Sequence, residues 1–287
     1  MWGRQSTLFV SVPGCLRPTF KPAQRAQART MMNKGTRGLA FYAILIYAFL
    51  HLPLLILAVF SFNSSKFTLW EGFSLHWYRA ALSDGDLLEA AGNSLIIAAC
   101  ATLLATVIGT LAAYGLWKRA SPWLAGTMYL SLVTPEIVTG VSLLALFQWS
   151  FRFLNLGLGM HTVILAHVAF SVAYVAVVVM ARLRTFDPAL EEAALDLGAT
   201  EWSAFQRVTL PYLVPAIGAA AMLAFTVSID DYVITSLVAG VDSQTLPMVI
   251  YALARRGVNP MLNAVSTIVV FALGSMVLLA ERLRASS

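Results

Sequence analysis

Charged residues are scarce in this chain of 287 residues. Asp, Glu, Lys and Arg together make up only 11% of the sequence, whereas 59% is hydrophobic and the mean hydropathy is +0.76. A soluble globular domain carries about 25% charged residues. The composition therefore excludes a water-soluble globular protein, a disordered chain and a collagen-like chain, and it indicates an integral membrane protein.

The motifs of catalysis and cofactor binding are missing as well. The sequence has no Gly-Lys dipeptide, which excludes a Walker A loop, and it has no HExxH motif and no cysteine pair at metal-ligand spacing. Cys15 lies in a polar tail and Cys100 in an apolar run, so a disulfide between them is not expected. His167 lies inside an apolar stretch, where a hydrogen bond to a neighbouring helix is favoured over a metal ligand or a proton relay. We expect no catalytic activity, no bound cofactor and no metal site.

Long apolar runs dominate what is present. A membrane-spanning helix needs about 20 mostly apolar residues. Six such stretches, none of which contains Lys or Arg, occur at 39–60, 91–116, 123–149, 161–181, 212–237 and 262–280. The sequence therefore predicts an all-α membrane protein with six transmembrane helices.

The basic residues predict the orientation of these helices. The segments on one side of the membrane, which include both termini, carry 14 Lys and Arg, and those on the other side carry 5. Because cytoplasmic loops are enriched in positive charge, this excess predicts cytoplasmic termini and gives no reason to expect a nucleic-acid partner. We expect a basic tail at 1–38, a transmembrane domain at 39–281 and a short tail at 282–287. The first span is too long for a cleaved signal and is interpreted as a signal anchor, with Met31 and Met32 as alternative starts.

The loop at 182–211 is the most informative cytoplasmic segment. Asp187 followed by Pro188 is a helix-start pattern, and Gly198 is suited to ending the first helix. A second short helix is expected to run to Pro211. The loop is therefore predicted to form a bent pair of short helices at the membrane surface, and both docking to another protein and an ordinary amphipathic connector remain open interpretations.

A resemblance to a known family favours docking. Glu192-Ala193-Ala194, then three residues, Gly198, nine residues and Val208-Thr209-Leu210-Pro211 resemble the EAA signature of permeases from ABC importers. This resemblance implies the type I ABC importer permease fold, with a coupling helix that fits a cleft in a cytoplasmic ATPase. ATP and its magnesium would then be bound by that partner. The residues assigned to ATPase coupling are Glu191, Glu192, Ala193, Ala194, Gly198, Leu210 and Pro211.

Four further segments resemble one particular group within these importers. They are FSFNSSKFTLWEGFSLHWY at 60–78, TPEIVTGVSLLALF at 134–147, LAHVAFSVAYVAVVV at 165–179 and FTVSIDDYVITSLVAG at 225–240. They are similar to the second permease subunit of spermidine/putrescine importers. The resemblance implies polyamine import across the bacterial inner membrane, in contact with lipid. The implied partners are a second related permease, two ATPase subunits and a periplasmic polyamine-binding protein.

Three carboxylates fall within the predicted spans, namely Glu136, Asp230 and Asp231. An ionisable side chain inside a bilayer costs about 2.5–3.5 kcal/mol on insertion scales and therefore suggests a function. Both spans run outward, and the rise of a helix places Glu136 about 20 Å and Asp230 about 27 Å from their cytoplasmic ends. Pro135 would loosen the helix beside Glu136. On one continuous helix the two aspartates point about 100° apart, so one of them is expected to face a pathway.

Aromatic side chains could complete a site for organic cations. Carboxylates pair with ammonium groups, and aromatic faces attract both the charge and the methylene stem. Trp149, Tyr174 and Tyr232 are the candidates. Two alternatives stay open, namely an ABC importer for another organic cation or a metal ion, and a secondary transporter or cation channel that uses Glu136 and Asp230 as an ion relay. A purely structural scaffold would leave the three carboxylates unexplained.

Overall fold

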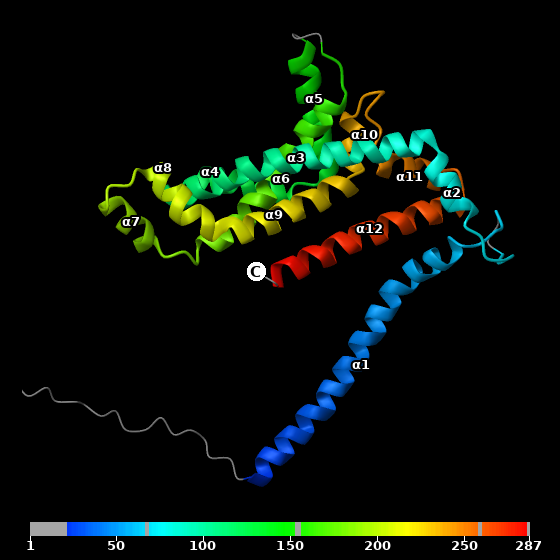
Figure 1. Cartoon of the computed structure of the whole chain (residues 1–287), viewed down its shortest axis with the longest axis horizontal. Coiled ribbons are helices and arrows are strands. Elements are labelled where there is room, and N and C mark those ends of the chain that lie inside the picture. The colour runs from blue at the N-terminus through cyan, green and yellow to red at the C-terminus, as the bar shows by residue number, and fades with distance from the viewer. Residues whose placement is uncertain (1–21, 67–68, 153–155, 258–259, 286–287) are drawn as a thin grey trace, which may run out of the picture. The chain divides into compact units, whose positions relative to one another are not determined.

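The computed structural model describes residues 22–66, 69–152, 156–257 and 260–285 (Figure 1). Every named element in these residues is helical. In chain order they are α1 (Pro22–Phe60), α2 (His76–Ser83), α3 (Gly85–Lys118), α4 (Pro122–Val133), α5 (Glu136–Arg152), α6 (Met160–Leu183), α7 (Pro188–Asp196), α8 (Glu201–Ala204), the π-helix η1 (Phe205–Thr209), α9 (Leu210–Asp230), α10 (Val233–Val238), α11 (Leu246–Arg255) and α12 (Pro260–Ala285). The chain divides into two units, Met1–Ile56 and Leu57–Ser287, and the packing described below lies in the second.

The transmembrane character of the chain is confirmed. Five segments are long and apolar enough to cross a membrane, at Gly38–Phe60, Gly85–Lys118, Met160–Leu183, Glu201–Asp230 and Pro260–Leu278. The bent pair α4 and α5 makes a sixth if it is taken as one span. These six positions correspond to the six predicted stretches.

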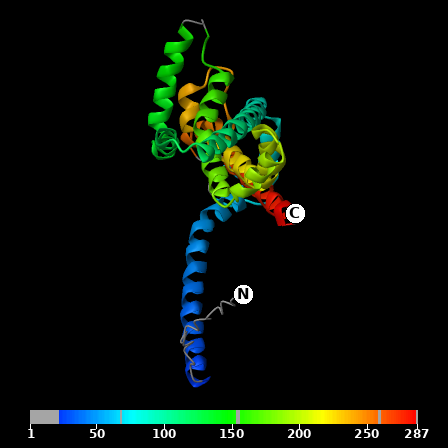
Figure 2. The ribbon, with the colours of Figure 1, turned by 90° about the vertical axis from the view of Figure 1, so that its left-hand side faces the viewer.

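The predicted span at 123–149 is not a continuous helix. α4 ends at Val133, α5 begins at Glu136, and the two helices are bent by 113°. Figure 2 shows α5 turned away from the direction of the central helices. The cause is Pro135, which disfavours helical geometry in the residue before it, and Thr134 is indeed extended with ψ at 129°.

The predicted span at 212–237 is also interrupted. α9 ends at Asp230, Asp231 is extended with φ at −65° and ψ at 125°, and α10 begins two residues later.

At the other end of this span, the prediction of a separate short helix ending at Pro211 is wrong. α8 and η1 continue into α9 without a break, and the π-helical turn stands directly before Leu210 and Pro211.

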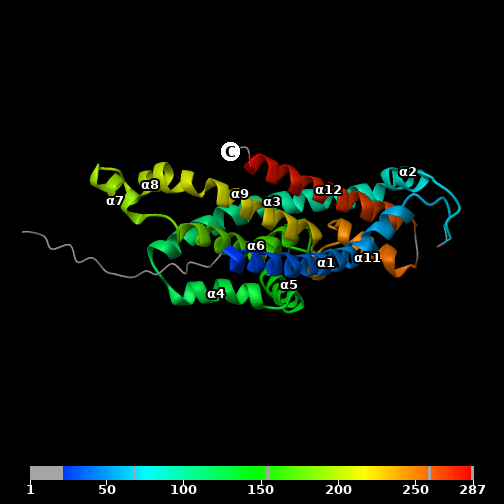
Figure 3. The same cartoon turned by 90° about the horizontal axis from the view of Figure 1, so that it is seen from below.

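The core of the second unit is formed by α3, α6 and α9, which lie side by side in Figures 1 and 3. Small residues line their contacts, including Ala105, Ala113, Ala176 and Ala220. Small side chains allow membrane helices to approach closely. At Gly109 an added Cβ would lie 2.9 Å from the Val172 carbonyl oxygen, so α3 and α6 are in near-backbone contact there.

Two further clusters complete the packing. One joins α5, α6 and α10 around Phe147, Phe170 and Ile234, and the other joins α2, α11 and α12 to the first turn of α3. The helix α12 runs to Ala285, so most of the predicted tail at 282–287 is helical. Of the predicted basic tail at 1–38, residues 22–38 belong to α1, and residues 1–21 lie outside the described part of the chain.

Candidate functional site

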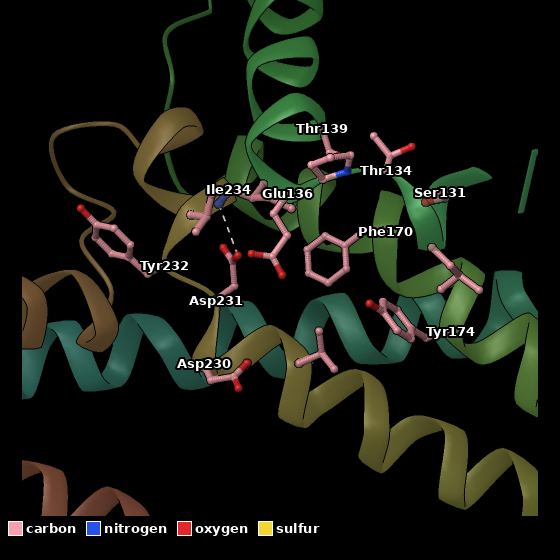
Figure 4. A pocket seen from close by; sticks show the side chains of 14 residues that line it. Ser131, Thr134, Glu136, Thr139, Phe170, Tyr174, Asp230, Asp231, Tyr232 and Ile234 are labelled. Atoms are coloured by element: carbon pink, nitrogen blue, oxygen red, sulfur yellow. Dashed lines mark hydrogen bonds between the residues drawn. The ribbon is translucent and has the colours of Figure 1, made fainter. Parts of the chain in front are cut away.

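The two interrupted spans border one cavity. Its volume is about 400 Å³, and its walls come from α4, α5, α6, α9, α10 and the residues that join α4 to α5 and α9 to α10 (Figure 4). Glu136, Asp230 and Asp231 all line it. The three carboxylates that the sequence singled out are therefore brought together, and each lies at or next to the end of a helix.

Asp231 is held by its own surroundings. Its side chain is 6% exposed, and its carboxylate accepts hydrogen bonds from the backbone nitrogens of Ile234 (3.3 Å) and Thr235 (2.8 Å) and from the Thr235 hydroxyl (2.8 Å). His167 places its Nε2 atom 3.4 Å from the same carboxylate. The ring of His167 also bonds to the hydroxyls of Ser228 (2.7 Å) and Thr235 (2.9 Å). The expected hydrogen bond from His167 to a neighbouring helix is confirmed, and Asp231 acts as a cap of α10.

Asp230 and Glu136 have a different environment. Both residues are exposed to solvent, and neither forms an ion pair with another residue in the described part of the chain. Both aspartates line the cavity, because α9 ends at Asp230 and Asp231 no longer follows helical geometry. Only Asp230 is exposed, since the Asp231 carboxylate is bonded to the first turn of α10. Asp230 and Glu136 are therefore the carboxylates that are placed to meet a cationic ligand.

Two of the three candidate aromatics belong to the cavity. Tyr174 and Tyr232 line it, together with Phe170, which the sequence analysis did not single out. The ring of Tyr232 lies 4.3 Å, between centroids, from that of Tyr251. Trp149 lies on α5, is 68% exposed and is not among the lining residues. The described residues contain no cluster of His, Cys, Asp or Glu placed to hold a metal ion.

The segment around α7 forms a second candidate site. The Asp187 side chain accepts a hydrogen bond from the backbone nitrogen of Ala189 (3.1 Å), and Pro188 occupies the first turn, as the sequence predicts. Gly198 has φ at +90°, a value that residues with a Cβ atom rarely adopt, and it ends the turn after α7. Glu192 and Ala193 are exposed on α7 and can face a partner.

Glu191 differs from its neighbours because it points inward. It is 1% exposed, and its carboxylate accepts hydrogen bonds from the hydroxyls of Tyr114 (2.5 Å) and Thr209 (3.2 Å) and pairs with the Lys118 ammonium (2.8 Å). Burial opposes ionisation of this carboxyl, but its hydrogen bonds to Lys118 and Tyr114 outweigh that cost, and the pKa of Glu191 lies below its usual value. The sequence assigns Glu191 to ATPase coupling together with Glu192, and the structure shows that the Glu191 carboxylate faces the permease and not the surface.

Comparison with known proteins decides the family. Residues 105–285 match the family described as "Binding-protein-dependent transport system inner membrane component". The chain belongs to this family of permeases. The permease is 45% identical over 238 residues to the putrescine transport system permease protein PotI of Escherichia coli (strain K12). The alignment covers 80% of this chain and 85% of PotI. It is 40% identical over 227 residues to the spermidine/putrescine transport system permease protein PotC of the same strain, in an alignment that covers 78% of this chain and 84% of PotC.

Solved structures give the fold. The permease aligns with a TM-score of 0.69 to a chain of a bacterial ABC transporter involved in the import of the acidic polysaccharide alginate, over 90% of this chain and 99% of the other. It aligns with a TM-score of 0.60 to a chain of the MetNI methionine ABC transporter, over 70% and 95%. Both are 16% identical to it in sequence. The predicted fold, that of an ABC importer permease, is confirmed, and the permease is a multi-pass protein of the inner membrane.

Proposed function

We propose that this permease moves polyamines, putrescine or spermidine, inward across the membrane as one subunit of an ATP-driven importer. The observation that carries the proposal is the cavity at the two helix breaks, where Glu136 and Asp230 are exposed and Tyr174 and Tyr232 add aromatic faces. Polyamines carry several ammonium groups on methylene stems, which such a set of groups can bind. The relatives PotI and PotC are named for transport of these compounds.

In this proposal the cavity residues have separate tasks. Glu136 and Asp230 pair with ammonium groups, whereas Asp231 keeps the start of α10 in place. Tyr174 and Tyr232 contact the charge and the methylene stem. The helix breaks matter because unwound segments at membrane depth are stable only where they line a cavity or are buried in protein.

The partners follow from the same proposal. We expect a second related permease, two ATPase subunits that bind ATP and magnesium, and a periplasmic protein that delivers the polyamine. The exposed face of α7, with Glu192, Ala193 and Ala194, would dock on an ATPase subunit, and Gly198, Leu210 and Pro211 would shape the segment around it. Both termini would lie in the cytoplasm, in agreement with the excess of basic residues on that side.

Transport would proceed by alternating access. Closure of the ATPase dimer around ATP would move α7 and its counterpart in the second permease, and the helices that line the cavity would change from inward-open to outward-open. The polyamine would enter from its binding protein and leave to the cytoplasm after ATP hydrolysis. The chain itself would perform no chemistry.

The direct test is uptake of radiolabelled putrescine and spermidine by cells that lack this permease, with and without the restored gene. The proposal expects uptake to be lost and then regained, and the comparison ranks the two substrates. Restoration with the variant Asp230→Asn is expected to give weak uptake at normal protein levels. Unchanged uptake of both compounds, in cells without another polyamine importer, would contradict the proposal and favour another organic cation.

A secondary transporter or channel is distinguished by its energy source. A carrier that used Glu136 and Asp230 as an ion relay would work without ATP and would respond to the proton or sodium gradient. The proposed importer would lose uptake when ATP is withheld from proteoliposomes, whatever the gradient. Uptake driven by a gradient alone would therefore contradict an ATP-driven mechanism.

A further inference from the structure

One buried carboxylate joins α7 to the rest of the second unit. Within the described residues, the side-chain hydrogen bonds and ion pairs between α7 and other elements all end on Glu191. Tyr114 and Lys118 stand one turn apart on the last turns of α3, and Thr209 closes η1. α7 otherwise packs chiefly against α8 and η1. Glu191 is therefore the polar link from α7 to α3.

The two elements that Glu191 holds lead to the cavity and to a distant loop of the second unit. η1 continues directly into α9, whose last residue is Asp230 in the cavity. α3 has 34 residues and so extends for about 51 Å. At its far end Asn93 donates a hydrogen bond to the Gln244 carbonyl (3.1 Å), and the Ser94 hydroxyl accepts one from the Leu246 nitrogen (2.8 Å). Glu191 is therefore connected through continuous helices to both the cavity and the loop before α11.

The partners of Glu191 are themselves packed against other side chains. The ring of Tyr114, which donates to Glu191, also packs against Phe205 in η1, with 4.5 Å between ring centroids. The Lys118 ammonium, which pairs with Glu191, also lies 5.5 Å from the centre of the Trp117 ring. A π-helical turn is rare and occurs often at functional sites. Here it places the Thr209 hydroxyl on the carboxylate of Glu191.

We propose that Glu191 is a positioning residue that transmits the movement of α7 to α3 and α9, and that it does not contact the ATPase. The inference rests on the proposed function as an ATP-driven importer, and it separates two adjacent glutamates by task. Glu192 is exposed on α7 and faces the partner, whereas Glu191 is buried and faces the permease. Loss of Glu191 leaves α7 docked on an ATPase subunit but loosely attached to the helices it has to move.

The test uses the complete transporter, purified through a tag on this permease and reconstituted into liposomes. ATP hydrolysis and polyamine uptake are measured together for Glu191→Ala and Glu191→Gln, and Glu201→Gln, an exposed glutamate in the next helix, is the matched control. For Glu191→Ala we expect the ATPase to co-purify and hydrolysis to continue, while the uptake per ATP falls at least about tenfold, because bonds to a buried charge are lost. Glu191→Gln keeps the shape and loses the charge, so its decrease is smaller. The control keeps the normal ratio.

Exchanging the charges of Glu191 and Lys118 tests their pairing directly, because a purely structural role of Glu191 would not be rescued by the exchange. Glu191→Lys alone is expected to uncouple the transporter, and its combination with Lys118→Glu is expected to restore part of the uptake per ATP. Loss of the ATPase from the purified complex in both Glu191→Ala and Glu191→Gln would overturn the inference, because it would make Glu191 a docking residue. An unchanged ratio of uptake to hydrolysis in Glu191→Ala would overturn it as well.

A second measurement tests the role of Glu191 independently of which substrate the transporter carries. In a background of Cys15→Ser and Cys100→Ser, Thr139→Cys places a thiol on the cavity wall, and its labelling by a membrane-impermeant reagent is compared with and without ATP. We expect ATP to change the labelling in this background but not when Glu191→Ala is added. If the unmodified complex took up no polyamine, the proposed substrate would be wrong, yet this labelling would still test Glu191. An ATP response that persists in Glu191→Ala would refute transmission through this residue.

Discussion

Asp230 and Asp231 are adjacent in sequence, yet the structure gives them different roles that substitution to asparagine can separate. Asp230→Asn removes an exposed charge from the cavity and breaks no bond that holds the helices. Asp231→Asn removes a buried charge that accepts hydrogen bonds at the start of α10 and lies beside His167. We expect the first change to impair transport at normal stability and the second to destabilise the permease.

The magnitudes follow from the bonds at each site. A hydrogen bond to a charged group contributes about 1.5–3 kcal/mol. Asparagine at 231 keeps one acceptor oxygen and turns an amide toward donors, so a loss of about 3 kcal/mol is expected, which is about a hundredfold in an equilibrium. For a chain of this size that corresponds to a melting temperature lower by roughly 5–10 °C. At Asp230 the lost pairing with an ammonium group should raise KM about tenfold, and the melting temperature should stay within roughly 2 °C.

The assay combines two measurements on the same preparations. Thermal unfolding of the detergent-solubilised complex is followed by size-exclusion chromatography after heating, and uptake kinetics are measured in proteoliposomes. Asp230→Glu, which keeps the charge, is the matched control and should retain most of the uptake. The assignment of roles would be refuted if Asp230→Asn lowered the melting temperature as much as Asp231→Asn, or if Asp231→Asn raised KM at unchanged stability.

Three other predictions concern packing and pH. Gly109→Val should prevent close approach of α3 and α6, since even a Cβ there lies 2.9 Å from the Val172 carbonyl oxygen, and it should lower the yield of monodisperse complex and its melting temperature. Gly240→Ala would force its Cβ into the Leu158 carbonyl, and limited proteolysis should show a loosened loop between α10 and α11. Because the pKa of Glu191 is lowered in the folded chain, its stabilising contribution is complete above the ordinary glutamate value of about 4.3 and is lost as the pH falls through the lower pKa. A melting-temperature series at pH 3–6 should therefore show a shallower acid loss for Glu191→Gln than for the unmodified permease.

Much of the architecture could be predicted from the sequence because the membrane imposes strong constraints. Uninterrupted apolar runs must be helical in lipid, since every backbone polar group needs a partner, and this determined the number and positions of the spans. The start of α7 at Asp187-Pro188 and its end near Gly198 followed from local capping rules. The three carboxylates stood out because such residues are costly in a bilayer.

What the sequence did not predict depends on contacts between distant segments. A proline next to a glutamate suggested a loosened helix, but not a bend of 113° between α4 and α5. The break after Asp230 has no proline or glycine beside it, and it is stabilised by bonds from Thr235 and by His167 of another helix. The inward orientation of Glu191 depends on Tyr114, which lies 77 positions away in sequence. Local patterns contain no information on such partners.

The bend at Pro135 also affects how the proposed site behaves when it is empty. Glu136 is in the first turn of α5, where the unpaired backbone N–H groups and the helix dipole provide partial positive charge. Asp231 is similarly satisfied by the first turn of α10. The first turns of α5 and α10 thus provide partial positive charge for two of the three carboxylates, which offsets part of the negative charge of a vacant cavity. A carrier has to pass through its empty state in every cycle, and this arrangement lowers the cost of letting the cargo go.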